Sequence, residues 1–100
     1  MVTGKQRAYL RKLGHELKPV MQIGKEGLTD TVITAIDEVL EKRELVKFSV
    51  LENAMLDTRE VCDEVAERLL AIPVQSIGNR FIIYRRSSNE KNRRIELPKR

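Results

Sequence analysis

Residues 20–40 read VMQIGKEGLTDTVITAIDEVL, and this stretch sets the pattern for the rest of the chain. The apolar run 20–23 is short enough for a strand, and the glycine-flanked segment Gly24–Gly27 ends it abruptly. From Leu28 onward the apolar residues recur with the 3.6-residue period of a helix, and Thr29 is suited to cap it. A strand that leads directly into an amphipathic helix predicts an α/β fold.

The sequence before and after this unit supplies a further helix and a further strand. Thr3 and Gln6 have the spacing of a capping box, and leucines at helical spacing follow them. We expect Gly14 to end or fray this first helix. Residues 45–51 alternate between apolar and polar side chains, which predicts a half-buried strand with Phe48 in the core.

The C-terminal half predicts a third helix and two strands. Asp57 is suited to cap this helix, and Pro73 prevents it from continuing. Residues 74–77 and 80–85 are predicted strands, joined by the two-residue hairpin signal Gly78-Asn79.

The predicted order of elements is therefore α-β-α-β-α-β-β. Strands that alternate with helices require some parallel pairing, whereas the closing hairpin is antiparallel. We expect an α/β fold with a four-stranded mixed sheet and three helices. Its 100 residues suit a single domain over 1–100, of which 86–100 form a basic C-terminal tail. A disordered tail is the usual result of such composition, although the sequence leaves its order open.

Charge is distributed unevenly along the chain. The net charge is +4, but residues 1–27 carry six Lys or Arg against two acids and 72–100 carry eight against two. Residues 28–71 carry five against eleven. A body with one positive face would attract polyanions, although a generic solubilising surface explains the same totals.

The residues needed for catalysis or for metal binding are scarce. His15 is the only histidine and Cys62 the only cysteine, and Cys62 lies on the apolar stripe of a predicted helix. A buried Cys62 is the simpler interpretation, and His15 could contact phosphate or serve as a plain surface residue. We therefore expect no enzyme, no metal and no cofactor. The lone cysteine, the lack of a signal peptide and the lack of a membrane-spanning run favour a cytoplasmic protein.

The acids of the second predicted helix, Asp37, Glu38, Glu41 and Glu44, have the pattern of a solvated face. An acidic surface on this helix or on the third predicted helix could also bind a protein, so a protein-interaction module that associates with the ribosome through its acidic helices is the alternative function.

The segment Gly24-Lys25-Glu26-Gly27 has a plausible binding mechanism. Two glycines let a ligand backbone approach closely, and the helix that follows directs free N–H groups toward the loop. A G-x-x-G loop holds the nucleic-acid backbone in KH modules. Glu26 and Asp30 would oppose an anion, and the two glycines could serve only the turn.

Taken together, these segments resemble the CRM domain, whose single-domain bacterial members are the YhbY-like proteins. The resemblance covers essentially the whole chain in the right order, and it rests on these motifs: Leu10-Arg11-Lys12-Leu13, His15-Glu16-Leu17-Lys18-Pro19-Val20, Ile23-Gly24-Lys25-Glu26-Gly27-Leu28-Thr29, Val74-Gln75-Ser76-Ile77-Gly78, Ile82-Ile83-Tyr84-Arg85 and Ile95-Glu96-Leu97-Pro98. The chain departs from the family pattern at Asn79-Arg80-Phe81, which leaves contacts of the hairpin with RNA in doubt.

The resemblance implies a fold similar to the C-terminal domain of translation initiation factor three, and it implies RNA binding. For stand-alone bacterial members it implies association with precursors of the large ribosomal subunit. We expect a monomer with no membrane and no small-molecule substrate among its partners. The expected RNA-binding residues are Lys5, Arg7, Arg11, Lys12, Lys18, Gly24, Lys25, Glu26, Gly27, Arg80, Arg85 and Arg86.

Overall fold

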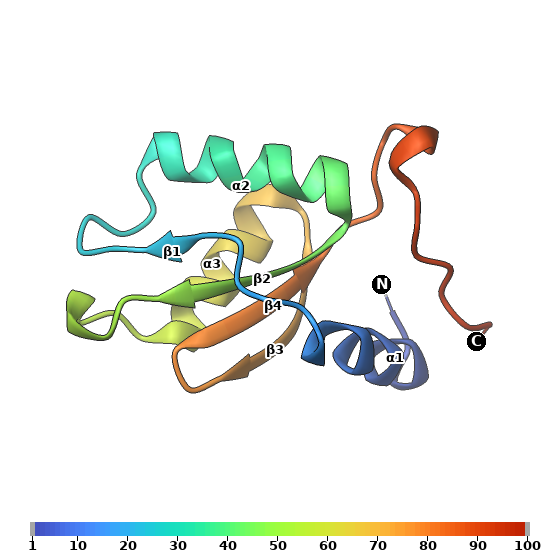
Figure 1. Cartoon of the computed structure of the whole chain (residues 1–100), viewed down its shortest axis with the longest axis horizontal. Helices are drawn as coiled ribbons and strands as arrows, with labels where there is room; N and C mark the ends of the chain where they lie inside the picture. The colour runs from blue at the N-terminus through green and yellow to red at the C-terminus, as the bar shows by residue number, and fades with distance from the viewer. Residues whose placement is uncertain (1, 100) are drawn as a thin grey trace.

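A four-stranded sheet organises the chain, with its strands in the order β1-β2-β4-β3 (Figure 1). In the computed structural model, which describes residues 2–99, β1 runs parallel to β2 and the other two pairings are antiparallel. The strands are β1 (Gln22–Ile23), β2 (Leu45–Val50), β3 (Ile72–Ile77) and β4 (Arg80–Tyr84). The predicted mixed sheet and the predicted order of elements are confirmed.

Each of the three helices begins at the residue that its sequence predicts. The side chains of Thr3, Thr29 and Asp57 each accept a hydrogen bond from the backbone N–H three residues later. At Thr3 the reciprocal bond from the Gln6 side chain completes the capping box. The helices are α1 (Gly4–His15), α2 (Asp30–Arg43) and α3 (Thr58–Leu69), with short 3₁₀ turns η1 (Glu52–Ala54) and η2 (Glu90–Asn92).

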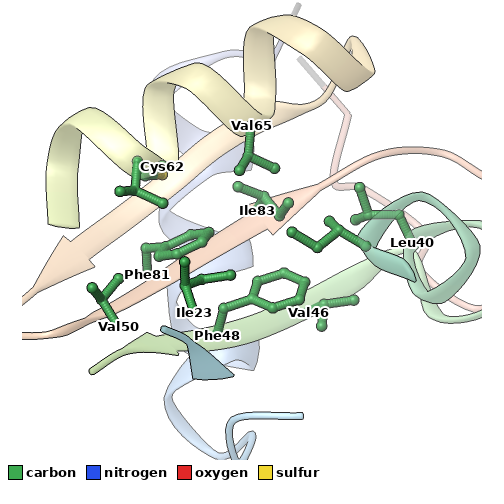
Figure 2. Packing of buried hydrophobic residues seen from close by; sticks show 11 residues of the cluster. Ile23, Leu40, Val46, Phe48, Val50, Cys62, Val65, Phe81 and Ile83 are labelled. Atoms are coloured by element: carbon green, nitrogen blue, oxygen red, sulfur yellow. The ribbon is translucent and has the colours of Figure 1, made fainter. Parts of the chain in front are cut away.

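The main core lies between one face of the sheet and the helices α2 and α3 (Figure 2). Phe48 of β2 and Phe81 of β4 are stacked at its centre, with their ring centroids 5.2 Å apart. Cys62 of α3 is buried in the same core, which confirms its predicted burial. Burial raises the pKa of the Cys62 thiol to about 11.

The opposite face of the sheet is covered by α1 over only part of its area. Leu10 and Gly14 of α1 are buried against this face, together with Ile82 and Tyr84 of β4. Gly14 does not end the helix as predicted, because α1 continues through His15. Gly14 instead permits close packing, since a Cβ there would lie 2.6 Å from Cδ1 of Ile82.

Strand β3 begins two residues earlier than the sequence predicts. Pro73 lies inside β3, and the ladder with β4 has an irregularity between Pro73 and Gln75. A proline is tolerated here because β3 is an edge strand, where one side of the backbone needs no partner.

The acids of α2 do not form the predicted solvated face. The Glu44 side chain is fully buried, and its carboxylate accepts hydrogen bonds from the backbone N–H groups of Ser87 (2.9 Å), Arg94 (2.8 Å) and Ile95 (3.2 Å). Burial and the nearby Glu44 charge both raise the pKa of Tyr84. Glu44 thus fixes a segment some 43 to 51 residues further along the chain.

Two further acids of α2 are also engaged. Glu41 accepts hydrogen bonds from both Ser88 and Ser87, and these bonds, together with Arg85, lower its pKa to about 2. Asp37 pairs with Arg85 at 2.7 Å. Only Glu38 of the predicted acidic face remains an exposed acid without a partner among residues 2–99.

The C-terminal segment 86–99 therefore packs back on the domain (Figure 1). Its apolar residues Ile95 and Leu97 contact the cluster beneath α1, and the Gln6 side chain donates a 2.8 Å hydrogen bond to the carbonyl of Pro98. The sequence left the order of this tail open; in the structure, the carboxylates of Glu41 and Glu44 supply hydrogen-bond partners for its backbone.

Candidate nucleic-acid interface

A basic groove of about 640 Å³ lies where the end of α2 meets the start of β2. Five of its lining side chains are cations and none is an acid. Within residues 2–99, none of these five forms an ion pair with a carboxylate. The cations are Lys18, Lys42, Arg43, Lys47 and Arg94, and the other lining residues are Leu17, Pro19, Val20, Leu45 and Val46.

Four separate segments bring these cations together. Lys18 lies in the segment that runs beside β2, where the N–H of Val20 donates to the carbonyl of Lys47 (3.0 Å). Lys42 and Arg43 form the last turn of α2, where positive side chains are favoured by the helix dipole. Arg94 belongs to the C-terminal segment and is held at the groove because its backbone N–H donates a hydrogen bond to the Glu44 carboxylate.

Five unpaired positive charges around one groove repel one another in the free protein. A polyanion that enters the groove relieves this repulsion and releases its own counterions, so the groove is suited to phosphates.

Only Lys18 of these five was among the predicted site residues. Lys42 and Arg43 were not predicted, because they lie in the segment 28–71, in which acids outnumber Lys and Arg. Lys47 gave a usable signal, because it alternates with the core residues Val46 and Phe48 and therefore faces the other side of the sheet. Arg94 gave no local signal, since its position depends on contacts with distant residues.

Arg80 lies on the part of the sheet that α1 leaves open. It is exposed and stands in register with Ser49 on one side and Ile77 on the other, and Ser49 in turn pairs with Gln22 of β1. This row crosses the whole sheet beside the Gly24–Gly27 loop, because Gly24 follows β1 directly.

The Gly24–Gly27 loop forms a tight turn in which the Gly27 N–H donates to the carbonyl of Gly24 at 3.0 Å. Gly27 requires its glycine, with φ at +69°, whereas a Cβ at Gly24 would meet no atom within 4 Å. The fold itself therefore does not demand a glycine at position 24. Lys25 and Glu26 are both exposed at the tip of the turn.

The negative charge near this loop is partly offset. Arg68 of α3 lies 3.7 Å from the carboxylate of Asp30 and donates to the carbonyl of Leu28. The loop and the basic groove lie at opposite ends of α2 (Figure 1), roughly 20 Å apart for a helix of this length.

The four predicted cations of α1 divide between two flanks of the helix. Lys5 and Lys12 are seven residues apart and share one flank, where both are exposed. Arg7 and Arg11 are four residues apart and share the other, where both are half-buried. Arg7 lines a separate small cavity of about 180 Å³ beside β3. The structure thus does not bring all four α1 cations to one site.

Arg85 and Arg86 follow β4 but differ in their surroundings. The Arg85 side chain is only 19% exposed, and its guanidinium binds the carboxylate of Asp37 and the carbonyl of Leu69 (3.0 Å). Arg85 is therefore engaged in holding α2, α3 and β4 together. Arg86 is exposed and lines a cavity with Arg93 and Arg94.

Neither a metal site nor a membrane segment occurs in the part of the chain that the structure describes. No three His, Cys, Asp or Glu side chains of residues 2–99 are grouped so that they could hold a metal ion. None of the helices there combines the length and the apolar character that crossing a membrane requires.

Several known proteins match nearly the whole of this chain in sequence, and a solved structure matches its fold. The family model of the CRS1 / YhbY (CRM) domain matches residues 2–85. The Probable RNA-binding protein YqeI of Bacillus subtilis is 43% identical over 98 residues, covering 98% of this chain and 100% of that protein. An RNA-binding protein of Haemophilus influenzae is 34% identical, covering 95% and 93%.

Among solved structures, that of the Staphylococcus aureus protein SAV1595 has a TM-score of 0.80 and 45% identity, and covers 98% of this chain and 100% of that one. The predicted family resemblance is confirmed by the sequence match and by the shared fold. The chain therefore belongs to the CRS1 / YhbY (CRM) domain family.

Proposed function

We propose that this protein binds RNA without catalysing a reaction, through the phosphate backbone. The observation that carries the proposal is the basic groove, in which five cations lie without an acid. The names of the relatives in Bacillus subtilis and Haemophilus influenzae agree with RNA as the partner. The proposed surface comprises this groove, the open row with Arg80, and the Gly24–Gly27 loop.

The salt dependence of binding tests the groove directly. If its five cations each neutralise one phosphate of a single strand, log affinity falls with log salt at a slope of about −3.5. We expect Lys18→Gln to reduce the magnitude of this slope by about 0.7. Lys91→Gln is the matched control, because Lys91 is an exposed cation outside the groove. Fluorescence anisotropy with a labelled RNA, repeated at several salt concentrations, measures both quantities. A slope near zero, or equal effects of the two substitutions, would contradict the proposal.

The loop is tested by Gly24→Asp, which places a carboxylate where a phosphate would approach. Gly24 is preferable to Gly27, because any side chain at Gly27 is strained by its positive φ. Gly4→Asp is the control, since it too adds an acid in open space, at the start of α1 and far from the loop (Figure 1). We expect Gly24→Asp alone to weaken RNA binding while both variants keep the wild-type circular dichroism spectrum.

We further propose that the RNA is large-subunit ribosomal RNA or its precursor, and that the protein acts in the cytoplasm as a monomeric assembly factor. The assignment to large-subunit ribosomal RNA rests on the family resemblance. In-cell crosslinking of tagged protein, followed by sequencing of the RNA, tests it with Gly24→Asp as the control. Enrichment at defined large-subunit sites that the variant loses supports the assignment, whereas scattered crosslinks to other RNAs would remove it.

The alternative of a protein-interaction module loses much of its basis. Three of the four α2 acids that suggested it, Asp37, Glu41 and Glu44, bind other residues of the same chain. The exposed acids of α3 remain available for such a partner. RNA affinity that Gly24→Asp and Lys18→Gln both leave unchanged would favour this alternative.

A further inference from the structure

A second cavity lies on the open part of the sheet, between the end of α1 and the β3–β4 hairpin. Its volume is about 300 Å³, and it is lined by His15, Lys47, Gln75, Ile77, Arg80 and Ile82. The lining contains no acid, and Lys47 also lines the basic groove. The two hollows are thus neighbours that share one cation.

The register of the sheet explains this combination of side chains. Ile82 of β4 pairs with Lys47 of β2 on one side and Gln75 of β3 on the other, so the three form one row. Arg80 and Ile77 form part of the next row on the same face of the sheet, two residues further along. Because α1 ends at His15, the row of Arg80 and Ile77 is not covered and Ile77 remains 58% exposed, whereas Ile82 is 5% exposed and packs beneath Gly14 of α1.

The base and the phosphate of a nucleotide can each contact a suitable side chain in this cavity. Ile77 offers an exposed apolar surface for the face of a base, and the planar guanidinium of Arg80 can stack on that base. The amide of Gln75 offers a donor and an acceptor to the edge of the base. Lys47 supplies a positive charge for the phosphate that follows. A site that binds phosphate alone would need neither the apolar surface of Ile77 nor the amide of Gln75.

We infer that this cavity receives one unpaired base of the bound RNA, while the adjoining groove holds the phosphates on either side. The inference rests on the proposed function and adds to it a means of distinguishing an RNA with an unpaired nucleotide from a regular duplex. Aromatic residues do not fill this role, since Phe48, Phe81 and Tyr84 are buried and Tyr9 of α1 does not line the cavity. Arg80 takes the place that an aromatic ring occupies in many RNA-binding proteins.

The first test compares two labelled RNA stems that differ only by one bulged nucleotide. We expect the wild-type protein to bind the bulged stem about ten-fold more tightly, and Gln75→Ala to abolish this difference. Thr34→Ala is the control, because Thr34 is an exposed polar residue of α2 that lies outside this cavity, the basic groove and the row with Arg80. Neither substitution should change binding of the regular stem.

The second test follows the ¹H–¹⁵N resonances of the protein during titration with adenosine, guanosine, cytidine and uridine 5′-monophosphates, and with inorganic phosphate. At least one nucleotide should shift the side-chain amide of Gln75, whereas inorganic phosphate should leave it unmoved. Equal shifts with inorganic phosphate and with all four nucleotides would overturn the inference.

The outcomes separate this inference from the proposed function. Equal binding of both stems, with the salt slope and the Lys18→Gln effect intact, would overturn the base-binding cavity and leave backbone binding standing. No binding of either stem at low salt would overturn both.

Discussion

Replacing Glu44 by Gln should destabilise the protein more than any other single change of a charged residue in α2 or its cap. The Glu44 carboxylate is fully buried and is the acceptor for three backbone N–H groups, from Ser87, Arg94 and Ile95. Glutamine has nearly the same shape but only one acceptor oxygen. Its NH₂ group must therefore face at least one N–H that then lacks a partner.

The expected size of the effect follows from the bonds that are lost. A hydrogen bond to a charged group contributes about 1.5–3 kcal/mol, and a buried donor left unsatisfied costs a similar amount. One bond is lost and two lose their charge, so the free energy of unfolding should fall by about 2–4 kcal/mol. Total stabilities are about 5–15 kcal/mol, so this loss is large.

Urea unfolding followed by circular dichroism measures the global change, and hydrogen exchange at Ser87, Arg94 and Ile95 reports on the C-terminal segment. Glu38→Gln is the control, because Glu38 is an exposed acid of α2 without an ion-pair partner among residues 2–99 and should change stability by less than about 0.5 kcal/mol. Equal stabilities of the two variants, with these three amides still protected in Glu44→Gln, would refute the role assigned to Glu44. Because Glu44 also positions Arg94, Glu44→Gln should reduce the salt slope of RNA binding as well.

Gly14→Ala should lower the free energy of unfolding by about 1 kcal/mol in a urea titration, because overpacking against Ile82 outweighs the gain in helix propensity, whereas Gly4→Ala on the same helix should be nearly neutral. Cys62 should react with iodoacetamide at pH 8 about 100-fold more slowly in the folded than in the urea-unfolded protein, because burial raises its thiol pKa from 9.0 to about 11, and equal rates would contradict that burial. Since the pKa of Glu41 is lowered from 4.5 to about 2, its contribution to stability should be intact above pH 4.5 and be lost as the pH falls toward 2, which acid titration of wild type and Glu41→Gln can measure.

Features that depend on neighbouring residues were predictable from the sequence. The helix starts at Thr3, Thr29 and Asp57 were found because a cap and its N–H partner lie three residues apart. Strand β2 followed from alternation, and Phe48 was placed correctly in the core.

Features that depend on distant partners were not predictable. Nothing local shows that Glu44 binds residues near position 94, or that Gly14 lies beneath Ile82. The acids of α2 have the spacing of a solvated face. Only the fold shows that Asp37 binds Arg85 and that Glu41 and Glu44 bind the C-terminal segment. The basic groove was missed for the same reason, since its cations come from segments far apart in the sequence.

The contacts of the C-terminal segment also bear on how the protein is made. Translation proceeds from the N-terminus, so Glu44 leaves the ribosome well before its partners Arg94 and Ile95. Until they emerge, a nascent chain that has already formed the sheet holds the Glu44 carboxylate without these backbone donors. The carboxylate is then in contact with water. The groove lacks Arg94 during the same interval. A nascent chain therefore acquires its full affinity for RNA only after residues 94 and 95 have been synthesised and have bound to α2.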